Sequence, residues 1–111
     1  MRFTKNNWNK YFDGSNKKTT IRLKKSRLGH QKAYAGSYIK PEVLGEFDIV
    51  DIKEIKFKDL KLIDALLDGF GSEYSLKEEL TRLNGKIEPD TILYIHWTDN
   101  IVKEEDKLVV I

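Results

Sequence analysis

The chain has 111 residues, of which 40% are hydrophobic and 34% charged, and its formal net charge is +2. A chain of this length and apolar content folds as one domain around one core, so we treat residues 1–111 as a single α+β domain. It has no cysteine and only two histidines, which excludes disulfides, thiolate metal sites and cysteine nucleophiles and leaves too few histidines for a zinc centre.

No stretch of about 18 apolar residues could cross a membrane. The first ten residues, MRFTKNNWNK, lack the apolar segment of a signal peptide. We therefore expect a cytoplasmic monomer without membrane contacts, metal ion or cofactor.

The small net charge conceals an uneven distribution. Residues 1–32 contain ten Lys and Arg and one acid, whereas residues 33–111 contain ten basic and seventeen acidic residues. Such asymmetry favours a face that binds a polyanion. The alternative is that the two oppositely charged parts attract each other in the folded chain.

The segment NNWNKYFDG predicts a short helix that Asn6 or Asn7 caps, with Trp8, Tyr11 and Phe12 at helical spacing. A strand follows at about 18–24. Its alternation directs apolar side chains to one face and a basic stripe to the other. The stripe consists of Lys18, Thr20, Arg22 and Lys24.

Residues 25–37 are predicted to form a loop, and a short strand at 36–40 ends before Pro41. Residues 43–57 predict one long strand. Its apolar alternation changes phase at 49–50 and again between 52 and 55, which a regular strand cannot accommodate. We expect a bulge or bend at these points, as in a small curved or closed sheet.

Helical spacing returns after Asp59, a good N-cap, and ends at Gly69. Ser75 and Glu78 form a capping box for a second helix, which ends at Asn84-Gly85. Residues 91–98 predict a central strand, apolar on both faces, and residues 107–111 predict a last strand. The expected architecture is a barrel-like sheet of about five to six strands with two to three flanking helices.

The order of KKTTIR, FKDLKLIDALLDGF and DTILYIHW resembles the ASCH family, a member of the PUA-like group of small β-barrels that are linked to RNA. That family has a Lys, a Thr three residues later and an Arg two further on, which correspond to Lys17, Thr20 and Arg22. Its downstream acid-Gly-Phe pattern corresponds to Asp68-Gly69-Phe70. This chain departs from the pattern at Gly14, which precedes Lys17 by three residues rather than two, and at Asp68, where Glu is commoner.

The resemblance implies a PUA-like barrel with a cleft for RNA or a modified nucleoside. One bacterial branch hydrolyses N-acetylcytidine, and its catalytic roles correspond here to Lys17, Thr20 and Asp68. Other relatives look like ribonucleases or RNA-binding modules. Two alternatives to an amidohydrolase therefore stay open: a non-catalytic module that uses the basic N-terminal region, and a ribonuclease that needs no metal.

The chemistry of these residues is consistent with both kinds of role. A Lys beside other cations can act as a base for a hydroxyl, although a solvated Lys and a strand-forming Thr are the simpler interpretation. The residues predicted to bind RNA or another ligand are Lys18, Arg22, Lys24, Lys25 and Arg27. Arg22 could hold a phosphate or carbonyl oxygen, or form an ion pair with a downstream acid.

Asp68 lies in the last turn of a predicted helix, where an acid opposes the helix dipole. We expect Asp68→Asn to lose turnover with folding nearly intact. Trp8, Tyr11 and Tyr38 could stack on bases, although helical spacing also suits Trp8 to the core. His96 is predicted to be a buried structural residue.

Overall fold

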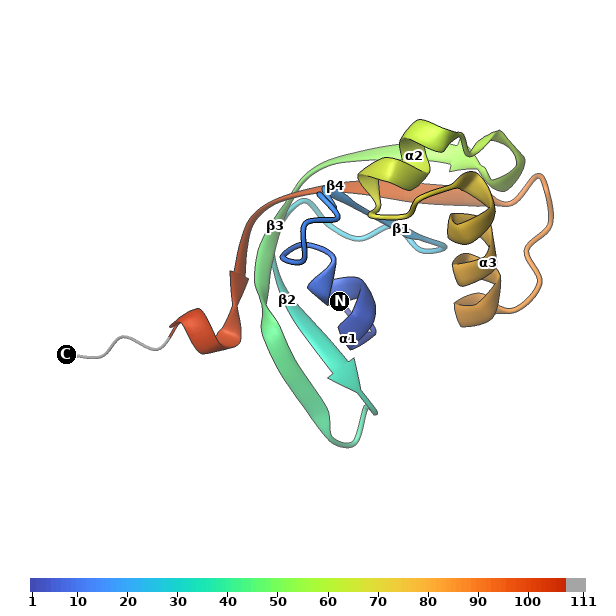
Figure 1. Ribbon diagram of the computed structural model, residues 1–111. Helices are drawn as coiled ribbons and strands as arrows, with labels where there is room; N and C mark the ends of the chain where they lie inside the picture. The colour runs from blue at the N-terminus through green and yellow to red at the C-terminus, as the bar shows by residue number, and fades with distance from the viewer. Residues whose placement is uncertain (108–111) are drawn as a thin grey trace.

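The computed structural model describes residues 1–107 of the chain. Its elements are α1 (Lys5–Asn9), β1 (Thr19–Arg22), β2 (Gly29–Gly36), β3 (Pro41–Lys56), the 3₁₀ turn η1 (Phe57–Asp59), α2 (Leu62–Leu67), α3 (Glu73–Asn84), β4 (Ile92–Lys103) and the 3₁₀ turn η2 (Glu104–Lys107). The strands form an antiparallel sheet in the order β1-β4-β3-β2, and the fold is α+β (Figure 1). The predicted central position of β4 is confirmed.

The long strands β3 and β4 bend together (Figure 1). Their register shifts between Ile49 and Asp51, so that Val50 is an extra residue on β3. An extra residue on one strand of a pair bends it and increases its twist. The bulge predicted at this point is confirmed.

The second predicted irregularity, at 52–55, is wrong, because the register is regular from Asp51 to Lys56. The alternation changes there for another reason. Ile52 packs against a hydrophobic cluster beside α1, and Ile55 packs against a different cluster beside α2 and α3.

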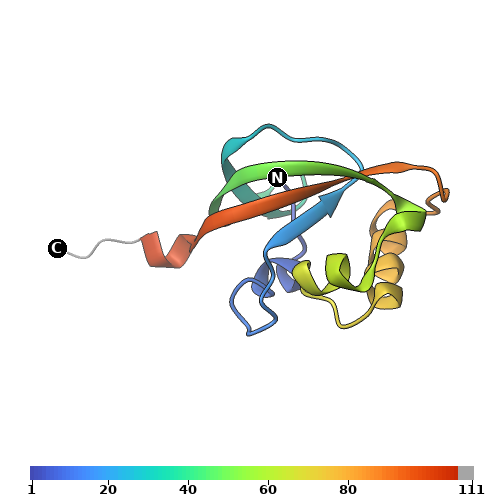
Figure 2. The same cartoon turned by 90° about the horizontal axis from the view of Figure 1, so that it is seen from above.

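These two clusters form the core. The α1 cluster consists of Phe3, Trp8, Ala33, Phe47 and Ile49, with Phe3 edge-to-face against both Trp8 and Phe47. The α3 cluster consists of Ile21, Leu60, Ala65, Leu76, Leu80, Ile87, Leu93 and Ile95. In Figure 2 the helices lie on one side of the strands. Side chains alternate along the regular segment 51–56, so Ile52 and Ile55 point to opposite faces of β3, and there the two clusters use opposite faces of the strand.

Gly45 allows the α1 cluster to approach the sheet closely. A Cβ atom at this position would lie 2.1 Å from the Val102 carbonyl oxygen and 2.8 Å from Cζ2 of Trp8. Both contacts are shorter than van der Waals distances, so only glycine fits between Trp8 and β4.

Helix α2 ends as predicted, in a Schellman motif. Gly69 has φ 83°, its N–H donates to the Leu66 carbonyl (3.1 Å), and the Phe70 N–H donates to the Ala65 carbonyl (2.8 Å). The predicted start was wrong. The helix begins at Leu62, because residues 57–59 form η1 instead.

Helix α3 begins three residues earlier than predicted, because Ser72 rather than Ser75 is the N-cap. The Ser72 side chain accepts a hydrogen bond from the Ser75 N–H at 3.0 Å. Helix α1 likewise has Thr4, not Asn6 or Asn7, as its N-cap. The predicted end of α3 at Asn84-Gly85 is confirmed.

The predicted loop at 25–37 and strand at 36–40 were wrong. Strand β2 occupies Gly29–Gly36, and residues 37–40 form the turn of the β2–β3 hairpin. The strand was missed because its buried positions are Ala33 and Ala35, whose small side chains give little hydrophobic signal.

Residues 1–107 form four strands rather than five to six, and the sheet is open between its edge strands β1 and β2. Most of the predicted strand 107–111 lies outside the described residues. The N-terminal segment lies between the two edges. The Phe3 N–H donates to the Tyr34 carbonyl on β2 (2.8 Å), and the Arg22 guanidinium on β1 donates to the Arg2 carbonyl. Within residues 1–107, no helix is both long and apolar enough to span a bilayer.

Candidate functional site

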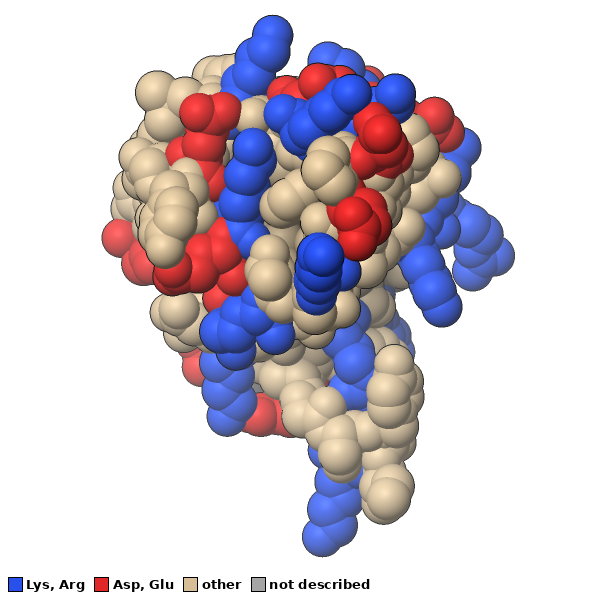
Figure 3. Space-filling model, turned by 90° about the vertical axis from the view of Figure 1, so that its right-hand side faces the viewer, with Lys and Arg blue, Asp and Glu red and all other residues tan. Residues whose placement is uncertain are grey.

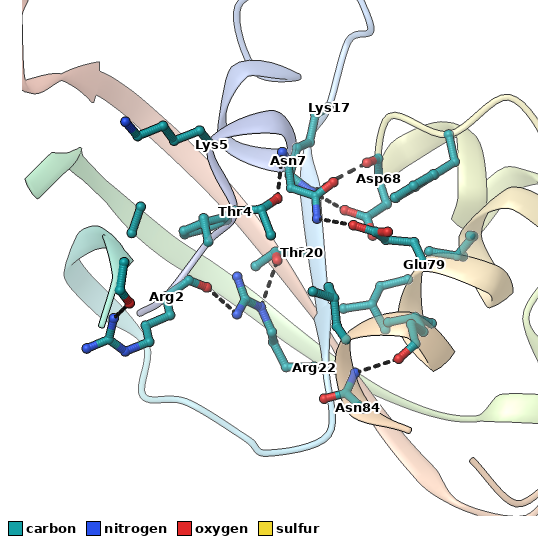
Figure 4. A pocket seen from close by; sticks show the side chains of 18 of the residues that line it. Arg2, Thr4, Lys5, Asn7, Lys17, Thr20, Arg22, Asp68, Glu79 and Asn84 are labelled. Atoms are coloured by element: carbon teal, nitrogen blue, oxygen red, sulfur yellow. Dashed lines mark hydrogen bonds and ion pairs between the residues drawn. The ribbon is translucent and has the colours of Figure 1, made fainter. Parts of the chain in front are cut away.

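A cavity of about 800 Å³ lies between the α1 and α3 clusters (Figure 4). Its walls come from both clusters, with Phe3 on one side and Ile21, Leu76 and Leu80 on the other. Its size is in the range of small-molecule sites. The polar side chains that line it include all three predicted catalytic residues, Lys17, Thr20 and Asp68.

Lys17 and Asp68 form a buried ion pair at one end of this cavity. Their side chains are 3% and 6% exposed, and the Lys17 Nζ donates to the Asp68 Oδ1. The same ammonium lies 3.4 Å from the Asp68 carbonyl oxygen and 5.2 Å from the centroid of the Tyr11 ring. Asp68 is the C-cap of α2, so the Lys17 charge compensates both the carboxylate and the negative end of the helix.

The backbone around residue 18 places Lys17 on the cavity. The Lys18 N–H donates to the Leu67 carbonyl at the end of α2 (2.6 Å), and the Lys18 carbonyl accepts from the Thr98 N–H on β4 (2.9 Å). Strand β1 begins only at Thr19. Since Lys17 precedes the regular strand, it and Thr20 reach one cavity although strict alternation would separate them.

Burial sets the protonation chemistry of the pair. It lowers the pKa of Lys17 and raises the pKa of Asp68, because each charged form is poorly solvated, and the partner's charge offsets part of each shift. Both pKa shifts favour the neutral form of the side chain over its charged form. The pair can therefore give and take a proton more readily than the same groups in water.

Thr20 has a hydroxyl whose acceptor side is occupied. Arg22 Nε donates to Thr20 Oγ1 at 3.0 Å, and the hydroxyl is buried. The proton of the Thr20 hydroxyl therefore points away from Arg22 Nε. Among the hydrogen bonds of the described residues, none joins Thr20 to Lys17 directly. Arg22 is half-buried and also contacts the ring of Phe3, 4.5 Å from its centroid.

Several polar residues of this cavity were not predicted from the sequence, among them Asn7 and Glu79. Asn7 on α1 donates from Nδ2 to Glu79 Oε2 on α3 at 2.9 Å, and Arg82 donates one hydrogen bond to each carboxylate oxygen of Glu79. Hydrogen bonding to Arg82 lowers the pKa of Glu79 and keeps it ionised. The only signal in the sequence was an ordinary helical Glu–Arg pair, because packing alone decides which face of α3 meets the cavity.

The predicted basic stripe on one face of β1 is wrong. The strand ends at Arg22, so Lys24, Lys25 and Arg27 lie in the following loop. Lys18 is exposed and does not line the cavity, and Lys25 and Arg27 line a separate hollow beside Asp51 and Ile52. Only Arg22 of the predicted ligand-binding residues reaches the main cavity, and Lys24 reaches an adjoining one.

His96 is a buried structural residue, as predicted. The Ser26 N–H donates to its Nε2 at 3.0 Å, so Nε2 is the unprotonated nitrogen and Nδ1–H donates to the Thr20 carbonyl at 3.1 Å. Burial lowers its pKa. Of the aromatic candidates, Trp8 is buried in the α1 cluster, Tyr11 packs behind Lys17, and Tyr38 is exposed at the cavity mouth.

No protein-family model matches the chain, and no curated protein matches it. A solved structure does: protein EF3133 from Enterococcus faecalis V583, which carries the family designation DUF984. The two chains are 16% identical, with a TM-score of 0.52 over 79% of this chain and 62% of the other. This similarity supports a shared fold, and the chain spans less than two thirds of its structural relative.

Proposed function

We propose that this protein is an ASCH-type amidohydrolase that removes the acyl group from the exocyclic amine of an acylated cytidine. One observation carries the proposal. Lys17, Thr20 and Asp68 line the same cavity, although 51 residues separate the first from the last. The spacing of the ASCH pattern selects these three residues without knowledge of the fold.

We also infer that the sheet belongs to a PUA-like barrel of five to six strands. Two features support this. The bulge at Val50 curves the long strands, and the N-terminal segment lies between the edges of β1 and β2. An experimental structure of the whole chain tests the inference, since a barrel needs at least one further strand beyond the four described.

In the proposed reaction, Lys17 first passes a proton to Asp68 within the buried pair, which leaves a neutral amine beside a protonated carboxyl group. Thr20 Oγ1 then attacks the acyl carbonyl, and its proton passes to the Lys17 amine. The lowered pKa of Lys17 favours this acceptor form. Catalytic hydrogen bonds often tighten only when substrate is bound, so the Thr20–Lys17 contact is expected in that complex. Arg22 has five N–H donors and uses two of them in hydrogen bonds to Thr20 and Arg2. Others can stabilise the developing oxyanion.

The C–N bond then breaks and the cytosine amine takes up a proton. Asp68, whose pKa is raised by burial, can supply this proton through Lys17. Water attacks the acyl-Thr20 ester next, releases the carboxylic acid and restores the hydroxyl. Each group returns to its starting protonation state.

Acetate release from N-acetylcytidine tests this proposal, with Thr20→Val as the critical variant. Valine keeps the shape and removes the nucleophile, so turnover should fall at least about 10³-fold. The matched control is Thr19→Val. Thr19 is the neighbouring buried residue, it does not line the cavity, and its hydroxyl has no hydrogen-bond partner among the described residues. A Thr20→Val protein as active as the parent would refute the proposal.

The second candidate is an RNA-binding module, and one observation favours it. Of the ten basic residues in 1–32, only Lys5 and Lys17 form ion pairs with acids among the described residues. Lys24, Lys25 and Arg27 are exposed, and Lys and Arg side chains project from the face in Figure 3. Attraction between the two halves of the chain therefore does not account for this charge.

Salt-dependent RNA binding tests the module. The log–log slope of affinity against salt should be about 0.7 per single-strand phosphate contact. The Lys24→Ala/Lys25→Ala/Arg27→Ala variant should flatten this slope. Binding without turnover of acetylcytidine would favour the module over the amidohydrolase, and cleavage of the RNA would favour a ribonuclease.

A further inference from the structure

A second cavity, of about 780 Å³, adjoins the first one. The two share four wall residues, Arg2, Arg22, Tyr38 and Asn84. The second cavity lies beside the start of the loop after β1, where it also includes Leu23 and Lys24. A ligand in the first cavity could thus extend past Arg22 into the second.

The two cavities differ in charge. The first has three acids, each with its own cation: Asp68 with Lys17, Glu79 with Arg82, and Glu42 with Lys5. The described walls of the second contain Arg2, Arg22 and Lys24 and no acid at all. The lining cations that have no acidic partner within residues 1–107 therefore lie on the shared wall, as Arg2 and Arg22 do, or in the second cavity, as Lys24 does.

The two arginines are held by neutral groups. The Arg2 guanidinium donates to the Gly36 carbonyl, and the Arg22 guanidinium donates to the Arg2 carbonyl and to Thr20. Neither arginine forms an ion pair within residues 1–107. Both side chains are partly exposed, and their hydrogen bonds to neutral groups hold them in place with their charge available to an anion.

Tyr38 provides a flat surface beside this charge. It lies at the turn of the β2–β3 hairpin and is 87% exposed, and the Arg2 guanidinium carbon is 3.7 Å from its ring centroid. The stacked guanidinium restrains one face of the ring and leaves the rest accessible. In Figure 3, where this hairpin projects downward, basic side chains lie between it and the body of the protein.

We propose that the second cavity binds the phosphate of a nucleotide, so that the preferred substrate is an acylated cytidine bearing a phosphate rather than the free nucleoside. Arg2 and Lys24 bind the phosphate, the former with the planar fork that suits its oxygens, and Tyr38 stacks on the sugar or a neighbouring base. The placement of the acylated base in the first cavity rests on the proposed function. The phosphate subsite itself does not.

Binding of unacylated ligands tests the subsite separately from catalysis. Calorimetry would compare cytidine, cytidine 5′-monophosphate and a short cytidine-containing oligoribonucleotide at low salt. The monophosphate should bind at least about tenfold more tightly than cytidine, the size of one charge-assisted hydrogen bond. Arg2→Gln should remove this difference. Lys32→Ala, which deletes an exposed charge that lines neither cavity, should preserve it.

Tyr38 gives a second, independent variant. Tyr38→Ala should weaken binding of the phosphorylated ligands several-fold, whereas Ile39→Ala should have no effect, because Ile39 is 92% exposed and lines neither cavity. A tighter complex with the oligoribonucleotide than with the monophosphate would identify an RNA chain as the source of the phosphate. Equal affinity would identify a mononucleotide.

Equal binding of cytidine and its monophosphate, or no binding of any of the three ligands, would overturn the subsite. Acetate release from acetylcytidine and from its 5′-monophosphate completes the experiment. If neither is deacylated while the phosphate preference and its loss in Arg2→Gln persist, the amidohydrolase proposal fails and the phosphate subsite stands.

Discussion

The charged side chains at the two ends of the main cavity have different kinds of partner. At one end, Lys17 and Asp68 are almost fully buried and neutralise each other. At the other, Arg2 and Arg22 donate to backbone carbonyls and a hydroxyl and stack on aromatic rings, and neither forms an ion pair within residues 1–107. The difference is that the fully buried cation has an acidic partner within the chain, whereas the two partly exposed cations have none within residues 1–107. The first end depends on its partner for stability, whereas the second should gain stability when an anion binds.

The largest effect is expected at the paired end. Asp68→Asn leaves the Lys17 charge buried without a partner and should lower the free energy of unfolding by about 3–5 kcal/mol. It should also lower turnover of acetylcytidine about 10²–10⁴-fold if the carboxyl acts as a general acid. From the sequence we expected folding to stay nearly intact, whereas the burial of this pair leads us to expect a loss of stability. Urea unfolding followed by tryptophan fluorescence measures the loss.

A double variant separates the two effects. Lys17→Met/Asp68→Leu replaces the buried pair with apolar side chains and should recover most of the lost stability, yet it should have no turnover. If the double variant is no more stable than Asp68→Asn, an unpaired buried charge is not the cause of the loss.

At the unpaired end, inorganic phosphate should stabilise the protein. Binding to the folded state alone stabilises by about 2.7 kcal/mol when phosphate is a hundred times its dissociation constant. Arg2→Gln should reduce this effect, because it removes one of the uncompensated cations. The measurement is a thermal melt in phosphate and in chloride of equal ionic strength. The same melting temperature in both salts would contradict the contrast between the two ends.

The pH dependence of the free energy of unfolding should reflect the titration of both Asp68 and Lys17. The pKa of Asp68 is raised above its ordinary 3.8, so its stabilising contribution is present at low pH and is lost as the pH rises through the folded pKa. The pKa of Lys17 is lowered from 10.5, so the unfolded chain binds a proton that the folded chain has released, and stability rises as the pH approaches 10.5.

The Lys17→Met variant should not show this rise in stability at alkaline pH. Unfolding in urea between pH 8 and 10.5, for the parent and this variant, provides the comparison. Parallel curves would mean that Lys17 titrates alike in the folded and unfolded chain.

The smallest effect is expected at the cavity rim. Lys5 and Glu42 form an ion pair at 2.8 Å whose side chains are 64% and 54% exposed. Water screens such a pair, so Lys5→Ala should cost no more than about 1 kcal/mol of stability. A double-mutant cycle with Glu42→Gln measures the pair. A coupling energy as large as that of Lys17 and Asp68 would show that burial is not what distinguishes the two pairs.

The sequence by itself determined the features that depend on neighbouring residues. The glycine and phenylalanine that end α2, the bulge at Val50 and the end of α3 at Asn84 were all predicted. Each follows from backbone preferences or apolar alternation within a few residues. The spacing of Lys17, Thr20 and Asp68 was also recognised from the sequence, as was the structural role of His96.

Only the tertiary structure decided what those residues meet. Alternation on β1 could not show that Lys17 precedes the regular strand and turns toward Asp68, because contacts with α2 and β4 hold the chain there. Nor could it show that Glu79 faces the cavity. Burial and charge compensation depend on elements distant in the sequence, and they determine whether a basic residue here is an internal partner or a binding group.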